Sequence, residues 1–275
     1  MLSDREIIST LDMVRSEHLD VRTVTLGVSL FDCVSHDLDL FIGNMRAKLR
    51  KYASNLVSVC NEVGDKYGIP VVNKRISVSP IAVVGGPFGP DGMVRICQAL
   101  DEAAQEAGVD FLGGFSALVE KGFAHGDKAL IEAIPEALAT TERVCSSINI
   151  ASSRAGINMD AAALMGRQIL ETARATADRG GFGCTKLVGF CNIPQDVPFM
   201  AGAYLGVGEP DCVINVGVSG PGVVKKAIDR ALEKSRSQGC GLSLLKVSEV
   251  IKRTAYKVTR VGEIIGNEVA ERLGI

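Results

Sequence analysis

Tryptophan is absent from this 275-residue chain, and aromatic residues make up only 5% of it. An aromatic platform on which bases or sugars could stack is therefore not expected. The sequence also lacks a G-x-G-x-x-G dinucleotide motif, a P-loop motif and a C-x-x-C pair. No apolar run reaches the ~20 residues that a membrane-spanning helix needs. The sequence thus indicates no metal site and leaves any cofactor unknown.

Charge and cysteine content further narrow the class of protein and its expected compartment. The formal net charge is -2, which favours neither nucleic acid nor an acidic membrane surface as a partner. The eight cysteines read as buried free thiols in a reducing compartment. The N-terminus is polar rather than a signal peptide, with Ser3 and Glu6 spaced as a helix capping box. A cytoplasmic protein is expected.

What the sequence does contain is a set of strands with one polar and one apolar face. Alternate residues of a strand point to opposite faces of its sheet. The polar rows are Thr23, Thr25, Gly27 and Ser29; Asn73, Arg75, Ser77 and Ser79; Cys145, Ser147 and Asn149; and Asn215, Gly217 and Ser219. Buried polar side chains need hydrogen-bond partners. The rows therefore predict a polar interior that holds a ligand or water.

Strand and helix patterns alternate along the chain. The six strands are expected at Val21–Leu30, Val71–Ser79, Val109–Leu118, Val144–Ile150, Lys186–Asn192 and Cys212–Ser219. Apolar residues from Leu38 to Val63 recur with helical spacing and predict one long helix. This order is typical of α/β proteins with a parallel sheet. The polar faces favour a partial (βα) barrel over an open doubly wound sheet, in a single domain over residues 1–275.

A glycine-rich turn is the most informative local motif. Gly217-x-x-Gly220-x-Gly222 follows a strand and opens a helix, where free backbone N–H groups could hold a phosphate or carboxylate. The alternative is a turn needed only for packing. Arg75 could bind the same kind of anion, or could form a structural ion pair with Asp32 or Glu209.

The candidate site collects polar residues from the ends of several strands, where parallel α/β folds carry their sites. Glu209 and Asp32 are the candidate catalytic acid or base, with solvated loop carboxylates as the alternative. The candidate ligand-binding residues are Asn73, Arg75, Ser77, Ser116, Asn149, Asn192, Asn215, Ser219, Gly220 and Gly222. An enzyme acting on a small anionic metabolite is expected. A ligand sensor and a structural or regulatory subunit are the alternatives.

Several longer strings resemble a known family. They include Val72–Pro80, Gly113–Val119, Val144–Ile150, Gly156–Met159, Pro198–Ala203 and Ile214–Val224. Together they resemble the UPF0210 family, also called DUF711, of bacterial and archaeal proteins. The resemblance implies a pyruvate formate-lyase-like fold, which is a ten-stranded α/β barrel of two antiparallel five-stranded halves. It also implies a homodimer and a longer chain, and it transfers no catalytic residues.

Overall fold

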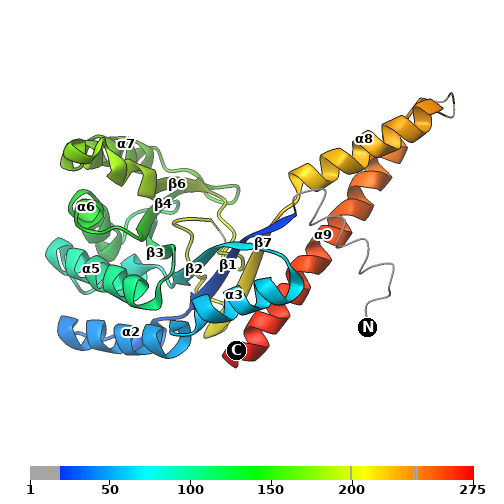
Figure 1. Cartoon of the computed structure of the whole chain (residues 1–275). Helices are drawn as coiled ribbons and strands as arrows, with labels where there is room; N and C mark the ends of the chain where they lie inside the picture. Colours follow the sequence, from blue (N-terminus) through cyan, green and yellow to red (C-terminus); the bar gives the residue numbers. More distant parts are fainter. Residues whose placement is uncertain (1–18, 199, 238, 240) are drawn as a thin grey trace. The chain divides into compact units, whose positions relative to one another are not determined.

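Strands alternate with helices along the chain (Figure 1). The computed structural model describes residues 19–198, 200–237, 239 and 241–275, so the capping box expected at Ser3 and Glu6 lies outside it. The strands are β1 (Asp20–Val28), β2 (Val71–Val78), β3 (Phe111–Leu118), β4 (Val144–Ser152), β5 (Gly156–Ile157), β6 (Leu187–Cys191) and β7 (Cys212–Ser219). The α-helices are α2 (Leu38–Ala53), α3 (Leu56–Tyr67), α4 (Ile81–Val84), α5 (Pro90–Ala107), α6 (His125–Thr140), α7 (Met159–Ala175), α8 (Pro221–Ser237) and α9 (Leu244–Leu273). The predicted α/β class is confirmed.

One predicted helix is divided in two. The sequence predicts a single helix from Leu38 to Val63, but α2 ends at Ala53 and α3 begins at Leu56. Ser54 and Asn55 form the turn between them. Serine and asparagine compete with helical hydrogen bonds by bonding to nearby backbone groups, which favours a break at this point.

The chain packs into two compact units. The larger contains Thr25–Val57 and Asn73–Asn215, and the smaller contains residues 19–24, Ser58–Val72 and Val216–Gly274. The single domain expected from the sequence stays a prediction. Parts of all seven strands lie in the larger unit, in the open order β5-β4-β3-β2-β1-β7, with β6 also paired with β4.

The sheet is mixed, so the expected all-parallel arrangement is wrong at two strands. β2, β3, β4 and β6 are parallel, whereas β5 turns back antiparallel on β4. β7 is antiparallel to β1, because Ser29 N donates to Asp211 O at 2.9 Å and Gly27 faces Val213. β7 follows a loop rather than a crossover helix, and an antiparallel neighbour needs no crossover.

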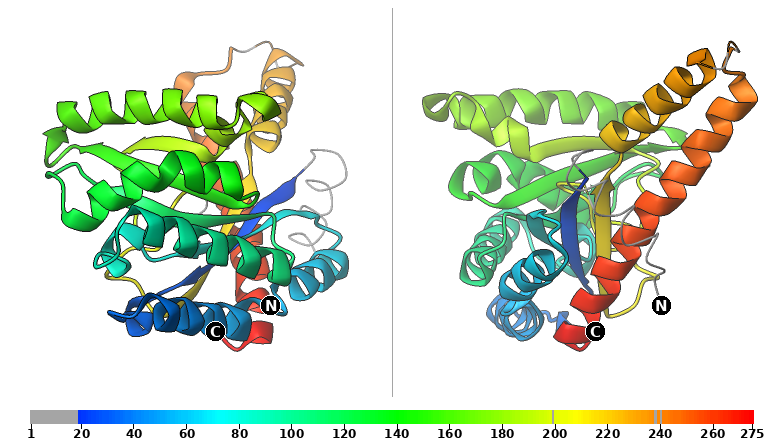
Figure 2. Two further views of the ribbon diagram at one scale, coloured as in Figure 1. Left: turned by 90° about the vertical axis from the view of Figure 1, so that its left-hand side faces the viewer. Right: turned by 45° about the vertical axis from the view of Figure 1, so that its right-hand side comes forward.

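Helices cover the apolar face of this sheet. Leu26, Ile76, Leu112, Ala117 and Ile148 are all buried. α5 and α6 pack against β3 and β4 on this face (Figure 2). Buried members of the predicted apolar rows, such as Ile76, Val78 and Ile148, therefore belong to the core of the larger unit, whereas Val72, in the smaller unit, is 42% exposed.

The smaller unit is built around the long helix α9. Gly262 and Gly266 let α9 approach β7, since a Cβ at Gly262 would lie 2.8 Å from Val218 Cγ2. α8 and α9 pack against each other as a helical hairpin (Figure 1). None of the helices in the described residues has the length and hydropathy needed to cross a bilayer.

Candidate functional site

The polar face of the sheet in the larger unit is occupied by the chain's own loop between β6 and β7. Ser77 Oγ donates to Ala203 O at 3.0 Å, and Ser147 Oγ donates to Gly202 O at 2.7 Å. Ser116 Oγ lies 2.8 Å from Ser147 Oγ and 3.3 Å from Gly202 O. The sequence predicts a ligand or water as the partner of this serine row, and the structure corrects that partner to backbone carbonyls.

Two adjacent glycines of β3 allow close backbone approaches, Gly113 to this loop and Gly114 to Val78 of β2. A Cβ at Gly113 would lie only 2.3 Å from Ala203 O, so a side chain there would collide with the loop backbone. Gly114 has φ 109°, and the register of β3 against β4 shifts between Leu112 and Phe115. Glycine tolerates both the positive φ and the close approach. Gly113 therefore lets the loop lie directly against the sheet.

Beyond the serines, the loop adds Tyr204 to a buried apolar cluster that the ends of β3 and β6 contact. Leu118, Asn149 and Phe190 lie side by side on β3, β4 and β6, in direct register. Leu118 and Phe190, the two residues that flank Asn149, pack against the buried cluster of Ile193, Ala203 and Tyr204. We call Tyr204, Asn149, Leu118, Phe190 and Glu120 the Tyr204 cluster.

The polar atoms of the Tyr204 cluster are unusually poorly paired. Asn149 Nδ2 donates to Glu120 Oε2 at 3.1 Å, but Asn149 Oδ1 has no hydrogen-bond partner among the described residues. The hydroxyl of Tyr204 likewise has none there. Tyr204 is 1% exposed and Asn149 is 5% exposed. Burial, helped by the negative charge of Glu120, raises the pKa of Tyr204 to about 12, so its hydroxyl stays protonated and able to donate.

A second carboxylate supports the loop that carries Glu120. Asp127 is buried at the start of α6 and accepts hydrogen bonds from Ala124 N at 2.8 Å and Leu118 N at 3.3 Å. Burial raises the pKa of Asp127, these two hydrogen bonds oppose the rise, and the charge of Glu120 adds to it. Asp127 thus fixes the end of β3 and keeps Glu120 in place.

Asn149 is the predicted residue that lies in the Tyr204 cluster, whereas Arg75 and Asn73 lie further down the sheet. Arg75 pairs with Phe111, seven residues before Leu118 on β3, which corresponds to roughly 20 Å at about 3.3 Å per residue. The Arg75 guanidinium lies over the Phe111 ring, 5.3 Å from its centroid. The predicted anion-binding arginine and the Tyr204 cluster therefore occupy different levels of the same face.

The predicted catalytic carboxylates also lie outside the contacts of the Tyr204 cluster. Lys48 bridges Asp32 at 2.7 Å and Asp211 at 2.5 Å near the β1–β7 edge. Partial burial raises the pKa of Asp32, but the hydrogen bond and charge of Lys48 outweigh it, so the carboxylate titrates below its usual range. Glu209 lies in the turn before β7, where its N–H donates to Gly206 O at 3.3 Å.

The remaining predicted residues are distributed over both units. Asn192 has a left-handed φ of 54° and holds a turn, since its side chain bonds to Ser153 N and Ser153 Oγ at 2.6 and 2.8 Å. Asn215 Nδ2 is buried without a partner among the described residues. Ser219, Gly220 and Gly222 connect β7 to α8 in the smaller unit, which confirms the strand-to-helix position of the glycine motif.

The described cysteines offer no activated thiol. Burial, followed by the charge of Asp32, raises the pKa of Cys33 to about 12, and burial raises that of Cys145 to about 11. Thiolates, not thiols, are the nucleophiles. Within the described ranges, His, Cys, Asp and Glu side chains form no group of three that could hold a metal ion.

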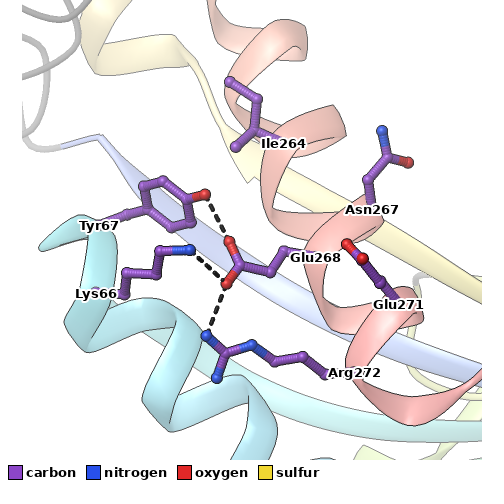
Figure 3. Close-up of a pocket in the computed structure, with 7 residues that line it drawn as sticks. All are labelled: Lys66, Tyr67, Ile264, Asn267, Glu268, Glu271 and Arg272. Carbon is purple, nitrogen blue, oxygen red and sulfur yellow. Dashed lines mark hydrogen bonds and ion pairs between the residues drawn. The ribbon is translucent and has the colours of Figure 1, made fainter.

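The smaller unit has a surface pocket of about 600 Å³ whose charges neutralise one another. Glu268 on α9 accepts hydrogen bonds from Lys66 at 2.8 Å, Tyr67 at 2.5 Å and Arg272 at 2.7 Å (Figure 3). These bonds, led by those from Lys66 and Tyr67, lower the pKa of Glu268 to about 2. We call these four residues the Glu268 cluster, and its satisfied contacts fasten α9 to α3.

Sequence reasoning missed Glu120 and Tyr204. Glu120 comes two residues after β3, which is the position that parallel sheets use for function. Tyr204 is one of only four tyrosines, and it stands in a loop of small residues and prolines. The position of Glu120 after a strand and the rarity of tyrosine are both visible in the sequence. The sequence does not indicate, however, which strand ends these two residues lie near.

Comparison with known proteins assigns the chain to a family. The family model described as "Uncharacterised ACR (DUF711)" matches residues 12–275. Three relatives named UPF0210 protein, from Desulfovibrio desulfuricans, Oleidesulfovibrio alaskensis and Methanosarcina mazei, are 81%, 71% and 54% identical to the chain. Each match covers 100% of this chain and 59% or 60% of the relative. The chain therefore belongs to the UPF0210 (DUF711) family, as the resemblance implied, and spans about 60% of the length of these relatives.

Proposed function

We propose that the larger unit binds a small polar metabolite at the Tyr204 cluster and acts on it as an enzyme. One observation carries the proposal: the Tyr204 hydroxyl and Asn149 Oδ1 are both buried, and neither bonds to a described residue. Leaving such groups unpaired costs free energy of folding. A molecule that bonds to both recovers that free energy, so the two atoms support a recognition role.

The chemistry of these atoms defines the ligand class. The hydroxyl of Tyr204 can donate to a carbonyl or carboxylate oxygen, and Asn149 Oδ1 can accept from a hydroxyl or amino group. Small hydroxy, oxo and amino acids carry both features. The anionic ligand expected from the sequence fits this class if its carboxylate accepts a hydrogen bond from the Tyr204 hydroxyl.

Glu120 supplies the group that could move a proton. It is half-buried, and its Oε2 accepts from Asn149 Nδ2 at 3.1 Å, so the same asparagine that meets the ligand orients the carboxylate. A positioned carboxylate can remove a proton from the carbon beside a carbonyl group. Glu120 takes this role in place of Asp32, whose carboxylate is held by Lys48.

A binding screen tests the recognition step. The thermal midpoint of the protein is measured with a panel of 2-hydroxy, 2-oxo and 2-amino acids. At least one of them should raise the midpoint of the wild type, and Tyr204→Phe should weaken the affinity for that compound by about tenfold or more. Tyr256→Phe is the matched control, because Tyr256 is 69% exposed. Equal responses in both variants and the wild type would remove Tyr204 from the site.

An exchange experiment separates an enzyme from a sensor. The best compound is incubated with the protein in D₂O, and NMR follows loss of the signal from the C–H hydrogen beside its carbonyl or carboxyl group. Wild type should exchange this hydrogen, and Glu120→Gln should bind the compound without exchanging it. Binding without exchange in the wild type would favour the alternative, a non-catalytic ligand sensor.

We further propose that the whole protein closes this sheet into the pyruvate formate-lyase-like barrel. β7 reverses direction beside β1, as expected where a second, antiparallel half begins, and the relatives contain additional chain. The homodimer implied by the resemblance, and the cytoplasmic location expected from the composition, are part of the same proposal. Circular dichroism and light scattering of a full-length relative, compared with this chain, test it; a full-length protein that remains monomeric would contradict the dimer.

A further inference from the structure

The α8–α9 hairpin concentrates positive charge in a chain that is acidic overall. Residues 221–260 contain ten lysines and arginines but only three acidic residues, which gives the hairpin a net charge of +7. The whole chain has a net charge of -2. The overall charge therefore conceals a strongly basic element, and an argument from net charge alone misses it.

The basic side chains lie on the outside of the hairpin. Val223 of α8 and Val258 of α9 are buried, whereas Lys246, Lys252 and Arg253 are exposed. The ion pairs Lys225–Asp229 and Arg260–Glu263 are local and solvent-exposed. Exposed pairs of this kind leave most of the positive potential available to a partner.

Exposed apolar residues accompany this charge at the tip of the hairpin. Leu244 and Leu245, the first two residues of α9, are 87% and 72% exposed, and Lys246 follows them. Ser243 caps the helix by accepting from Lys246 N at 3.3 Å, which holds both leucines on a formed first turn. Tyr256 and Ile251 add exposed apolar surface further along α9.

We propose that the α8–α9 hairpin is a docking arm for an anionic phospholipid surface. Lysines and arginines bind negatively charged headgroups, and leucines beside them can enter the boundary between headgroups and acyl chains. A nucleic acid backbone would match the positive charge but would leave the leucine pair in water. The hairpin lies on such a surface rather than crossing it.

Vesicle co-sedimentation of the full chain tests this proposal. The probes are phosphatidylcholine vesicles with and without about one-third phosphatidylserine. Wild type should bind the phosphatidylserine vesicles at low salt, and binding should fall at high salt because the attraction is screened. The double variant Leu244→Ser/Leu245→Ser should bind the vesicles more weakly by about tenfold or more, since two apolar side chains no longer enter the membrane.

Charge variants provide the matched control. Lys252→Glu/Arg253→Glu should weaken binding by about tenfold or more. Lys121→Glu/Lys128→Glu makes the same change of net charge at exposed positions of the larger unit and should bind nearly as wild type. Thermal midpoints confirm that the variants fold.

Three results would overturn the proposal. The first is that the wild type does not bind phosphatidylserine vesicles at low salt. The second is that both charge variants lose vesicle binding to the same extent. The third is full retention of vesicle binding in the leucine variant. Tight binding of duplex DNA with no vesicle binding would assign the hairpin to nucleic acid, and a dimer that the leucine substitutions dissociate would assign it to a second copy.

Discussion

Two tyrosines show how differently the two units use their polar groups. Tyr67 in the smaller unit donates to Glu268 at 2.5 Å, and that carboxylate also accepts from Lys66 and Arg272. Tyr204 in the larger unit is more deeply buried, yet its hydroxyl has no partner among the described residues. A satisfied network stabilises a fold, whereas an unsatisfied one costs stability and is typical of sites that await a ligand.

The largest effect is expected from a substitution that disturbs the packing of the Tyr204-bearing loop against the sheet. Gly113→Ala should lower the free energy of unfolding by about 3 kcal/mol or more, because its Cβ would meet the fixed carbonyl of Ala203. Chemical denaturation measures the change. Gly43→Ala in α2 is the control: nothing lies within 4 Å of its Cβ, and alanine there should stabilise the helix by roughly 0.5–1 kcal/mol. A Gly113→Ala protein as stable as wild type would show that the loop does not pack as described.

Next comes the pH dependence of the Glu268 cluster. The folded pKa of Glu268 is lowered to about 2, so its stabilisation is present above the ordinary glutamate pKa and is lost as pH falls toward 2. Glu268→Gln should cost roughly 1–2 kcal/mol at neutral pH, allowing for solvent screening, and almost nothing near pH 2. Unfolding curves between these limits measure the difference. Glu263→Gln, with an exposed carboxylate, should show no such convergence.

The two tyrosines themselves give the direct comparison. Tyr67→Phe should destabilise the protein by about 1 kcal/mol, because it removes a hydrogen bond to a charged group. Tyr204→Phe should leave the ligand-free protein unchanged or slightly more stable, because it removes an unpaired buried hydroxyl. Thermal unfolding of both variants without ligand decides this. Equal losses would mean that the Tyr204 hydroxyl has a bonding partner in solution.

The smallest effect concerns the carboxylate predicted from the sequence as catalytic. Asp32→Asn should cost only a few tenths of a kcal/mol, because the Asp32 carboxylate is solvent-exposed and Lys48 keeps its ion pair with Asp211. Because the pKa of Asp32 is lowered in the folded protein, this small stabilisation is present at neutral pH and is lost as the pH falls through the folded pKa. The Asp32→Asn variant should keep the C–H exchange activity proposed for Glu120. Loss of that exchange would return Asp32 to the site.

Much of the fold was predictable because strand alternation is a local property. The rows that contain Ile76 and Ser77 follow directly from a period of two residues, and the structure places them on opposite faces. The position of the glycine motif between β7 and α8 was predictable for the same reason. The break at Ser54 was not, because the apolar spacing continues through it.

The amino-acid sequence by itself determined which side chains are polar, how they alternate, and that residues 221–260 carry a net charge of +7 in an acidic chain. Only the tertiary structure decided what meets the polar face. The serines bond to the backbone of a loop more than 50 residues away along the chain, and Asn149 lies between Leu118 and Phe190 because three strands are in register. Strand alternation depends on neighbouring residues, whereas register and loop placement depend on contacts between distant ones.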